Sequence, residues 1–310
     1  MDVLVERACG LDVHKDSITA CIITSKRKEI QTFSTTTFYL LELIDWIKEH
    51  KCTHVAMEST GVYWKPIVNL LEAEGIEFLV VNAQHIKAVP GRKTDVKDAE
   101  WIAKLLRHGL LKASFIPNRE QRELRELVRY RRSIIEERAR QLNRIQKVLE
   151  GANIKLGSVV SNIVGVSSLD MLRSIANGND DLDVLVNYAR GVMKRKKEQL
   201  RLALQGYIQD HQRYMLKTII DHYDYLTNTI EMLDKEIAQR MSAYQDDIDR
   251  LDSIPGIARR MAEQMLAELG TKIEDQFPSA AHMCSWSGLV PSHNESAGKR
   301  KSSKTRKGNK

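Results

Sequence analysis

The sequence contains no long hydrophobic run. No apolar stretch among its 310 residues approaches the roughly 18–20 residues that an α-helix needs to cross a bilayer. Its opening residues, MDVLVERACG, carry acids and lack the apolar core of a signal peptide. These absences argue against a membrane protein and a secreted one, and they predict a cytoplasmic location.

Cysteine is also scarce, with four residues in the whole chain. Cys9, Cys21, Cys52 and Cys284 show no CxxC pair and no spacing typical of zinc ligands. The sequence therefore predicts reduced, mostly buried thiols rather than a disulfide framework or a zinc site.

What is present is a mild excess of positive charge. The chain has 48 Lys and Arg against 41 Asp and Glu, a formal net charge of +7. The last fourteen residues, AGKRKSSKTRKGNK, hold seven Lys or Arg and no acid. Such a segment suits a phosphate backbone or forms a solvated tail, and nucleic acid is the leading partner on charge.

Length and composition predict a globular protein of two or three domains, with 42% hydrophobic and 29% charged residues. Residues 1–115 alternate β-type and helical runs in the order β-β-β-α-β-α-β-α. This succession is typical of an RNase H-like α/β fold, although order alone leaves several α/β folds open. The expected strands are VERACGLDV, SITACIIT, EIQTFSTT, THVAMES and IEFLVVN.

The middle of the chain, residues 116–250, has a helical pattern. Residues 118–150 keep apolar side chains at three- and four-residue spacing, which predicts a long coiled-coil helix. Arg131 interrupts this stripe, and we interpret the surrounding charge as a solvated helix face. Short helices are expected over 151–193 and a second long helical stretch over 194–245, so the pair forms an antiparallel arm or a dimerising one. The first stripe comprises Leu124, Val128, Ile135, Leu142, Ile145 and Leu149.

Residues 251–270, LDSIPGIARRMAEQMLAELG, place a Pro-Gly turn between two helical segments. Backbone amides at such a turn can hold a DNA phosphate, with Arg259 and Arg260 beside it. This pattern is similar to a helix-hairpin-helix motif in a small helical C-terminal domain. An ordinary turn between two helices explains it equally well.

Four acids define the candidate catalytic and metal site. Asp12 ends the first strand, Glu58 ends the fourth, and Asp95 and Asp98 begin the helix in GRKTDVKDAEWIAKLL. In an RNase H-like sheet the first and fourth strands are neighbours, so all four acids converge. Converging carboxylates need cations between them, which predicts a two-metal site for Mg²⁺, with Mn²⁺ as a substitute. Each acid alone has an ordinary explanation as a strand end or a cap.

Basic residues surround this site in the sequence and suit a nucleic-acid substrate. They are Lys15, Arg92, Lys93 and Lys97.

The motifs GLDVHKD, AMESTGVYW, GRKTDVKDAEWIAKLL, IPGI and GLVPSHNESAGKRKSSKTRKGN occur in this order along the chain. In combination they resemble the bacterial insertion-sequence "one-ten" family of DEDD transposases, also called bridge recombinases. The resemblance implies a RuvC-like nuclease domain over 1–115, a coiled-coil linker over 116–250 and a transposase domain over 251–310. It also implies DNA partners at element ends and target, a structured guide RNA, a homo-oligomer, and action at the bacterial nucleoid.

The same resemblance identifies Ser296, in NESAGK, with the family's proposed nucleophile, which forms a covalent phosphoserine. Lys299 and Arg300 would stabilise the developing charge. From sequence alone Ser296 is one of several serines in a stretch that we expect to be a loop. The family usually continues past RKGN with further helices, so we expect this chain to be shorter than its relatives.

Two other functions remain open on the sequence. The four acids could serve a junction-resolving nuclease that uses water and no serine. The chain could also be a binding remnant that no longer cuts DNA.

Overall fold

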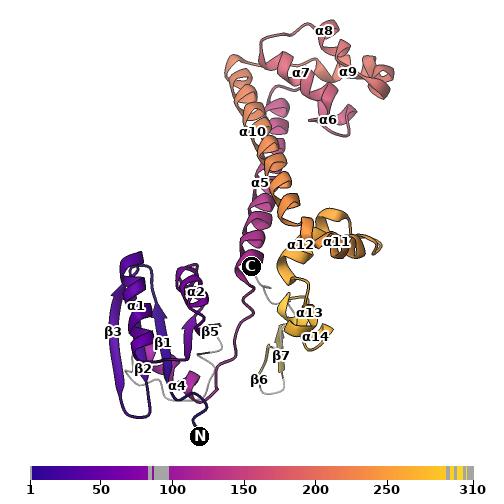
Figure 1. The fold of residues 1–310 in the computed structure, drawn as a ribbon. Coiled ribbons are helices and arrows are strands. Elements are labelled where there is room, and N and C mark those ends of the chain that lie inside the picture. The colour runs from indigo at the N-terminus through magenta and orange to yellow at the C-terminus, as the bar shows by residue number, and fades with distance from the viewer. Residues whose placement is uncertain are drawn as a thin grey trace. The chain divides into compact units, whose positions relative to one another are not determined.

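A computed structural model of the protein describes residues 2–82, 86, 98–290, 294–296, 299–302 and 305. The chain divides into two compact units, Met1–Arg119 and Glu120–Lys310 (Figure 1). We describe each unit by itself.

The first unit is built on a five-stranded mixed sheet in the order β3-β2-β1-β4-β5. β1 pairs antiparallel with β2 and parallel with β4, and β4 pairs parallel with β5. The predicted order of strands and helices, and the predicted adjacency of the first and fourth strands, are confirmed. The strands are β1 (Ala8–Val13), β2 (Ser17–Ile23), β3 (Lys28–Ser34), β4 (His54–Glu58) and β5 (Glu77–Val81).

Helices cover both faces of this sheet. On one face, α1 (Thr37–Glu49) and α2 (Trp64–Ala73) bury their apolar stripes in one core, where Leu43 and Ile67 share a cluster with Leu11. On the other face lies α4 (Asp98–Arg107), whose Ile102 shares a cluster with Ala8 of β1 and Ala56 of β4. The sheet is therefore buried on both sides, which explains its long apolar runs.

Gly10 fixes how closely α4 approaches the sheet. A Cβ at this position would lie 2.3 Å from the backbone oxygen of Ala99 and 2.4 Å from the backbone nitrogen of Ala103. A side chain cannot fit at such distances, so glycine lets the helix rest directly on β1.

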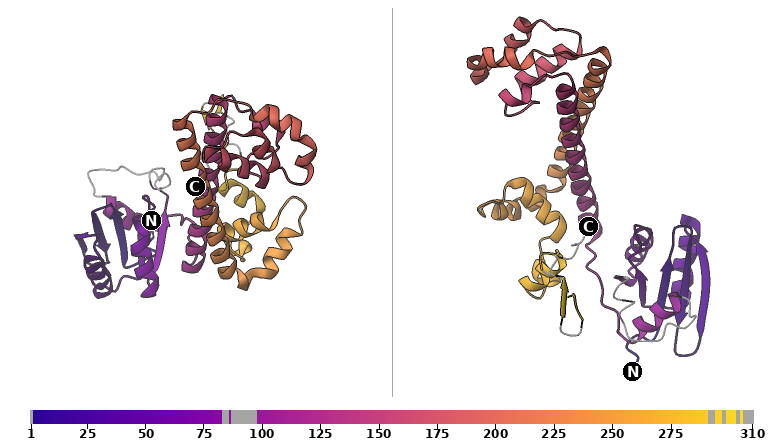
Figure 2. Two further views of the ribbon diagram at one scale, coloured as in Figure 1. Left: turned by 90° about the horizontal axis from the view of Figure 1, so that it is seen from above. Right: turned by 180° about the vertical axis from the view of Figure 1, so that it is seen from behind.

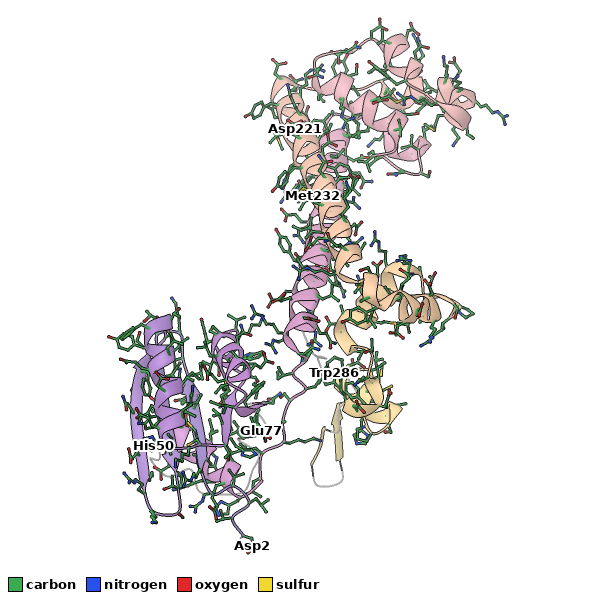
Figure 3. The ribbon with its side chains drawn as sticks, viewed as in Figure 1. Asp2, His50, Glu77, Asp221, Met232 and Trp286 are labelled. Atoms are coloured by element: carbon green, nitrogen blue, oxygen red, sulfur yellow. The ribbon has the colours of Figure 1, made fainter. Side chains whose placement is uncertain are left out.

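The second unit contains two long helices, α5 (Arg119–Gly151) and α10 (Asp210–Arg240), which lie side by side (Figures 1 and 2). Their buried residues meet in reverse order. Val128 shares a cluster with Ile237, and Ile145 shares one with Ile220. The helices are therefore antiparallel, which confirms that prediction. On the outer face of α10, Met232 exposes 65% of its surface (Figure 3).

The sequence pattern misplaced some details of this pair. Ile134 is buried against Leu226 and Ile230, whereas the predicted Ile135 is only partly buried. Arg131 does not lie on a solvated face. Its guanidinium pairs with Asp234 of α10, and its side chain is only 13% exposed.

The predicted helical stretch over 194–245 is also wrong as one segment. It divides into a 3-10 helix η1 (Gly191–Lys196), α9 (Lys197–Leu204), α10, a 3-10 helix η2 (Ser242–Tyr244) and the start of α11. Gly206 lies in the break between α9 and α10. A Cβ at this residue would lie 2.5 Å from the backbone oxygen of Ala152, so the close contact there requires glycine. The backbone amide of Tyr207 donates to the same oxygen at 2.8 Å.

Short helices lie between the two long ones, as the sequence predicted for residues 151–193. They are α6 (Leu156–Val159), α7 (Val166–Ala176), α8 (Leu182–Asn187), η1 and α9. Their core includes the fully buried Leu156, Leu172 and Leu200, and it continues into the adjoining ends of α5 and α10. We call residues 152–204 the tip module.

The remaining chain folds back onto the start of α5. α11 (Gln245–Asp252) and α12 (Arg259–Leu269) flank the Pro-Gly turn, where Gly256 has a positive φ of 92° that favours glycine. Leu266 of α12 shares a cluster with Leu124 of α5. Then follow α13 (Ile273–Gln276), α14 (Ala280–Trp286) and the antiparallel pair β6 (Asn294–Ser296) and β7 (Lys299–Ser302).

Two of these observations bear on the sequence predictions. The stretch around Ser296, expected to be a loop, contains the short strands β6 and β7. None of the described helices combines the length and the apolarity that crossing a membrane requires.

Candidate functional site

Asp12 and Glu58 lie next to each other at one end of the sheet. β1 and β4 run parallel with Leu11 opposite Met57, so the next residue of each strand is an acid. Glu58 is the last residue of β4, and Asp12 is the last but one of β1. The carboxyl ends of two neighbouring parallel strands thus carry the two carboxylates at the same level.

Both carboxylates belong to the face of the sheet that α4 covers. Side chains alternate between faces along a strand, so Asp12 lies on the face of Gly10, and Glu58 on the face of Ala56. Gly10 contacts the backbone of α4, and Ala56 shares a cluster with Ile102 of that helix. Leu11 belongs to the opposite core.

The helix α4, which covers this face, begins with a third predicted acid, Asp98. Ala8, at the start of β1, clusters with Leu106 near the end of α4, whereas Gly10 contacts Ala99 near its beginning. Gly10 meets Ala103 as closely as Ala99, and Ala99 also clusters with Cys21 and Ile23, which pair with Gly10 and Ala8 of β1. These contacts place the start of α4 over β1 and β2, and they do not place Asp98 beside Asp12. Asp98 itself is exposed. The structure thus brings Asp12 and Glu58 together, and the approach of Asp98 to them stays a prediction.

Among the described residues, no Lys or Arg neutralises Asp12 or Glu58. In the part of the chain that the structure describes, neither carboxylate forms an ion pair with a lysine or an arginine, and Asp12 contacts the ring of His14. The nearby Glu100 differs, because Lys28 and Lys104 approach its carboxylate at 3.0 and 2.7 Å. Hydrogen bonds from Lys104 and then Lys28 lower the pKa of Glu100. Glu100 is therefore a structural acid.

This donor set fits a hard divalent cation. Carboxylate oxygens are the ligands that Mg²⁺ and Mn²⁺ prefer, and un-neutralised neighbouring acids attract a cation to relieve their repulsion. Within residues 2–82, 86 and 98–290, however, no three His, Cys, Asp or Glu side chains come close enough to form a complete metal site. Asp95, the fourth predicted acid, lies outside the described residues.

His14 was not singled out from the sequence. Its Nε2 lies 3.2 Å from Oδ2 of Asp12, and its backbone amide donates to the carbonyl of Ser17 in the β1–β2 turn. A ring at this distance can orient the carboxylate. The available signal was the spacing in GLDVHKD, since residues two apart on a strand share a face.

The cations predicted around the acids are only partly described. Lys15 is exposed in the β1–β2 turn, and its carbonyl accepts a hydrogen bond from the hydroxyl of Thr35. Arg92, Lys93 and Lys97 lie outside the described residues.

The two arginines predicted to contact DNA are engaged in ion pairs. Arg259 and Arg260 begin α12, and both approach Glu263, at 3.3 and 2.8 Å. Arg260 also pairs with Asp234 at 3.0 Å, and Arg259 donates a hydrogen bond of 2.8 Å to the side-chain oxygen of Gln245. Their contact with DNA stays a prediction, and their present role is to anchor the start of α12.

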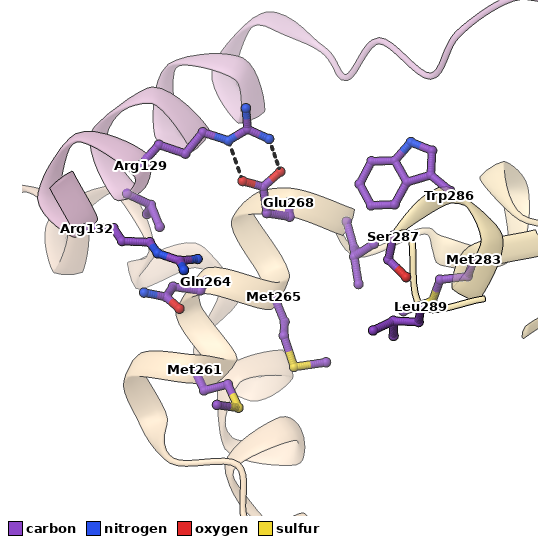
Figure 4. Close-up of a pocket in the computed structure, with 12 residues that line it drawn as sticks. Arg129, Arg132, Met261, Gln264, Met265, Glu268, Met283, Trp286, Ser287 and Leu289 are labelled. Atoms are coloured by element: carbon purple, nitrogen blue, oxygen red, sulfur yellow. Dashed lines mark hydrogen bonds and ion pairs between the residues drawn. The ribbon is translucent and has the colours of Figure 1, made fainter. Parts of the chain in front are cut away.

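A pocket of about 480 Å³ lies between α5, α12 and α14 (Figure 4). Its lining is mostly apolar and includes Met261, Met265 and Trp286. At its edge Arg129 donates two hydrogen bonds to the carboxylate of Glu268, at 2.6 and 2.8 Å (Figure 4). This paired contact fastens α12 to α5 and leaves little free charge at the pocket.

Ser296, Lys299 and Arg300 lie on the paired strands of the second unit. Ser296 pairs with Lys299 and Glu295 pairs with Arg300 in the β6–β7 register. In the backbone register Lys299 therefore lies opposite Ser296, and Arg300 lies opposite its neighbour Glu295.

Two models of one transposase family match the chain in order. A DEDD transposase model matches residues 9–154, and a model described as "Transposase IS116/IS110/IS902 family" matches residues 248–310. Together they cover more than half of the sequence, including every predicted site residue.

The chain belongs to the IS110 transposase family.

Relatives agree with this family assignment. The chain is 22% identical over 299 residues to a pilin gene-inverting protein of Moraxella lacunata, covering 93% of this chain and 73% of the relative. A pilin gene-inverting protein of Moraxella bovis shows the same identity and coverage. This IS110 transposase is thus an enzyme that acts on DNA.

Proposed function

We propose that the protein cleaves and exchanges DNA strands at a divalent-metal site formed by Asp12, Glu58, Asp95 and Asp98. The observation that carries this proposal is the placement of Asp12 and Glu58 at one level on neighbouring parallel strands, beneath the helix that begins with Asp98. The strand order and the helix positions support an RNase H-like assignment for this unit.

Different residues at this site would bind the metal, orient Asp12 and attract the DNA backbone. Asp12, Glu58, Asp95 and Asp98 would hold Mg²⁺ or Mn²⁺, which supplies electrostatic stabilisation of the phosphoryl group when bound. His14 orients Asp12 through its ring nitrogen. Lys15, with Arg92, Lys93 and Lys97, draws the DNA backbone toward acids that would otherwise repel it.

Ser296 completes the strand-exchange chemistry in this proposal. Its Oγ forms a bond to the phosphorus, its proton passes to solvent, and the bond from phosphorus to one deoxyribose oxygen breaks. That oxygen leaves as a hydroxyl after taking up a proton. The covalent intermediate is itself a phosphodiester between Ser296 and the DNA strand. The hydroxyl of a second strand can therefore attack its phosphorus and release Ser296. Lys299 and Arg300 stabilise the negative charge on the transferring group.

The remaining segments bind DNA and join copies of the chain. The α11–α12 turn, with Arg259 and Arg260 holding α12 in place, binds a DNA phosphate through backbone amides as a helix-hairpin-helix does. The α5–α10 pair acts as a coiled-coil arm that joins copies of the chain into a homo-oligomer. A structured guide RNA selects the DNA sites.

A hydrolytic nuclease is the second candidate. One observation favours it: the acids belong to the unit Met1–Arg119, whereas Ser296 belongs to the unit Glu120–Lys310. In that case water attacks the phosphorus, and no protein becomes attached to DNA.

A denaturing gel distinguishes these functions. Labelled element-end DNA is incubated with Mg²⁺ and RNA transcribed from the element's flank, and wild type is compared with Asp12→Ala and Ser296→Ala. A protease-sensitive shifted band in wild type alone supports the recombinase. Cleavage without that band, lost only in Asp12→Ala, indicates the nuclease, and absence of any product in wild type contradicts both.

A further inference from the structure

Four consecutive cations occupy an exposed turn of the tip module. Lys194, Arg195 and Lys196 end the 3-10 helix η1, and Lys197 begins α9. All four residues are exposed. We call Lys194–Lys197 the basic turn, and it was not among the residues that the sequence identified as DNA contacts.

The apolar residues on either side hold the basic turn in place. Met193, just before it, packs against the core of the tip module, and Leu200, just after it, is fully buried in that core. Because both flanking anchors point inward, the four cations between them face solvent on a folded support rather than on a free tail.

None of the four cations forms an ion pair with a described residue. Lys196 donates to the carbonyl of Val159 at 3.2 Å, and Lys197 donates to the side-chain oxygen of Asn187 at 2.8 Å. Both acceptors are neutral, so neither reduces the net charge of the turn.

The arginines that flank the turn are neutralised. Arg190 pairs with Asp170 at 2.6 Å, and Arg201 pairs with Asp183. The tip module thus compensates the charges on both sides of the basic turn and leaves the turn itself positive. Glu198 is the nearest acid in the sequence.

The spacing of the charges suits a phosphate backbone. A 3-10 helix rises about 2 Å per residue, so four residues span roughly 6 Å, about the separation of two successive phosphates of one strand. Residues 191–202 contain no aromatic side chain on which an unpaired base could stack. A backbone contact with double-stranded nucleic acid therefore fits the turn better than recognition of a single strand.

We propose that the basic turn binds the phosphate backbone of double-stranded DNA, without regard to sequence. The contact is separate from the acids at the sheet edge and requires neither metal nor serine chemistry. It rests on the proposed function only in taking DNA as the ligand.

The test is the salt dependence of binding to a 40-base-pair duplex, measured by fluorescence anisotropy between about 50 and 300 mM salt. The variant carries Lys194→Gln, Arg195→Gln, Lys196→Gln and Lys197→Gln. A matched control removes the same number of charges at scattered exposed positions of the same unit, with Arg140→Gln, Lys147→Gln, Lys217→Gln and Lys272→Gln. Circular dichroism melting checks that both variants fold as wild type does.

We expect the basic-turn variant to weaken binding roughly tenfold near physiological salt, and to reduce the slope of log K against log salt by about 2, from about 0.9 per lost phosphate contact. The scattered control should change the slope by less than about 1. Equal changes in both variants would show a general charge effect and overturn the proposal. A change seen with single-stranded RNA but not with the duplex would also overturn it.

Failure of the proposed strand-cleavage function can be told apart from failure of this inference. The binding measurement is made without a divalent metal and follows no cleavage, so its outcome does not depend on the chemistry of the acids. A wild-type protein that binds through the basic turn but never cleaves DNA contradicts the chemistry and leaves this inference standing.

Discussion

The sheet edge of the first unit and the paired helices of the second unit use charge in opposite ways. At the sheet edge, Asp12 and Glu58 lie side by side without a Lys or Arg partner among the described residues. Along the helices, Arg131 and Arg260 share Asp234, and Arg129 grips Glu268.

The difference separates two roles of charged residues. A charge that the fold neutralises contributes to packing and helix register, whereas an exposed charge without an opposite partner is solvated by water and can be paired by a ligand. The arginine-rich helix α5, which looks like a nucleic-acid surface by composition, is therefore largely structural. The acids and the basic turn have charge available for ligands.

The largest expected effect is on activity at the sheet edge. Asp12→Asn removes a direct ligand in a nearly isosteric way, and partners one step further from a metal already contribute 10–100-fold, so we expect DNA cleavage to fall by more than about 100-fold. Thermal stability should be unchanged or slightly raised, because one repelling charge is removed. Glu100→Gln is the matched control, since that acid is neutralised by lysines. Similar losses of activity in both variants would contradict the distinction between a metal-binding acid at position 12 and a structural acid at position 100.

The next largest effect is on the free energy of unfolding, through the packing of α4 on β1 at Gly10. Gly10→Ala places a Cβ 2.3 Å from the backbone of α4, so the helix must shift, at a cost of about 2–3 kcal/mol in the free energy of unfolding. Urea denaturation measures this loss. Gly157→Ala is the control, since no atom lies within 4 Å of the position that its Cβ would take, and α6 tolerates alanine. A neutral result at Gly10 would mean that α4 does not rest on β1 as described.

Breaking a shared ion pair in the helical unit should cost less. Asp234→Asn leaves Arg131 without its acid and Arg260 with Glu263 alone, and we expect a loss of about 2 kcal/mol in stability. The exposed pair of Asp247 with Arg250 provides the comparison, where Asp247→Asn should change stability by less than about 0.5 kcal/mol. Equal effects at the two acids would contradict the structural role of Asp234.

The smallest expected effect is a pH dependence at Glu100. Its pKa is lowered in the folded protein by Lys104 and Lys28, so its ion pairs stabilise the fold above the unfolded pKa of about 4.3. That contribution is lost as the pH falls through the lower folded pKa. Melting curves between pH 7 and pH 3 should therefore show a steeper loss for wild type than for Glu100→Gln, and parallel curves would contradict the assignment.

Much of the first unit could be predicted from sequence because its signals are local. Alternating and continuous apolar runs define the strands, and the acids fall at strand ends that parallel pairing brings together. The contact of His14 with Asp12 was harder to predict, because it depends on the shape of the β1–β2 turn.

The helical unit was predicted less completely for a physical reason. Arg131 occupies a buried position where the pattern expected an apolar residue. It can do so because Asp234 on the partner helix pairs with its guanidinium. The break before α10 depends on Gly206 meeting the backbone of Ala152, a contact between residues far apart in the chain. Periodicity alone carries no information about either partner.

Binding of Mn²⁺ to the full chain tests whether Asp12 and Glu58, which have no Lys or Arg partner among the described residues, hold a divalent cation. Titration calorimetry without DNA, on wild type, Asp12→Asn, Glu58→Gln and Glu100→Gln, reads binding independently of activity. Wild type and Glu100→Gln should bind Mn²⁺ alike, and the Asp12 and Glu58 variants should bind at least about tenfold more weakly. Equal binding by all four proteins would contradict a cation site at these two acids.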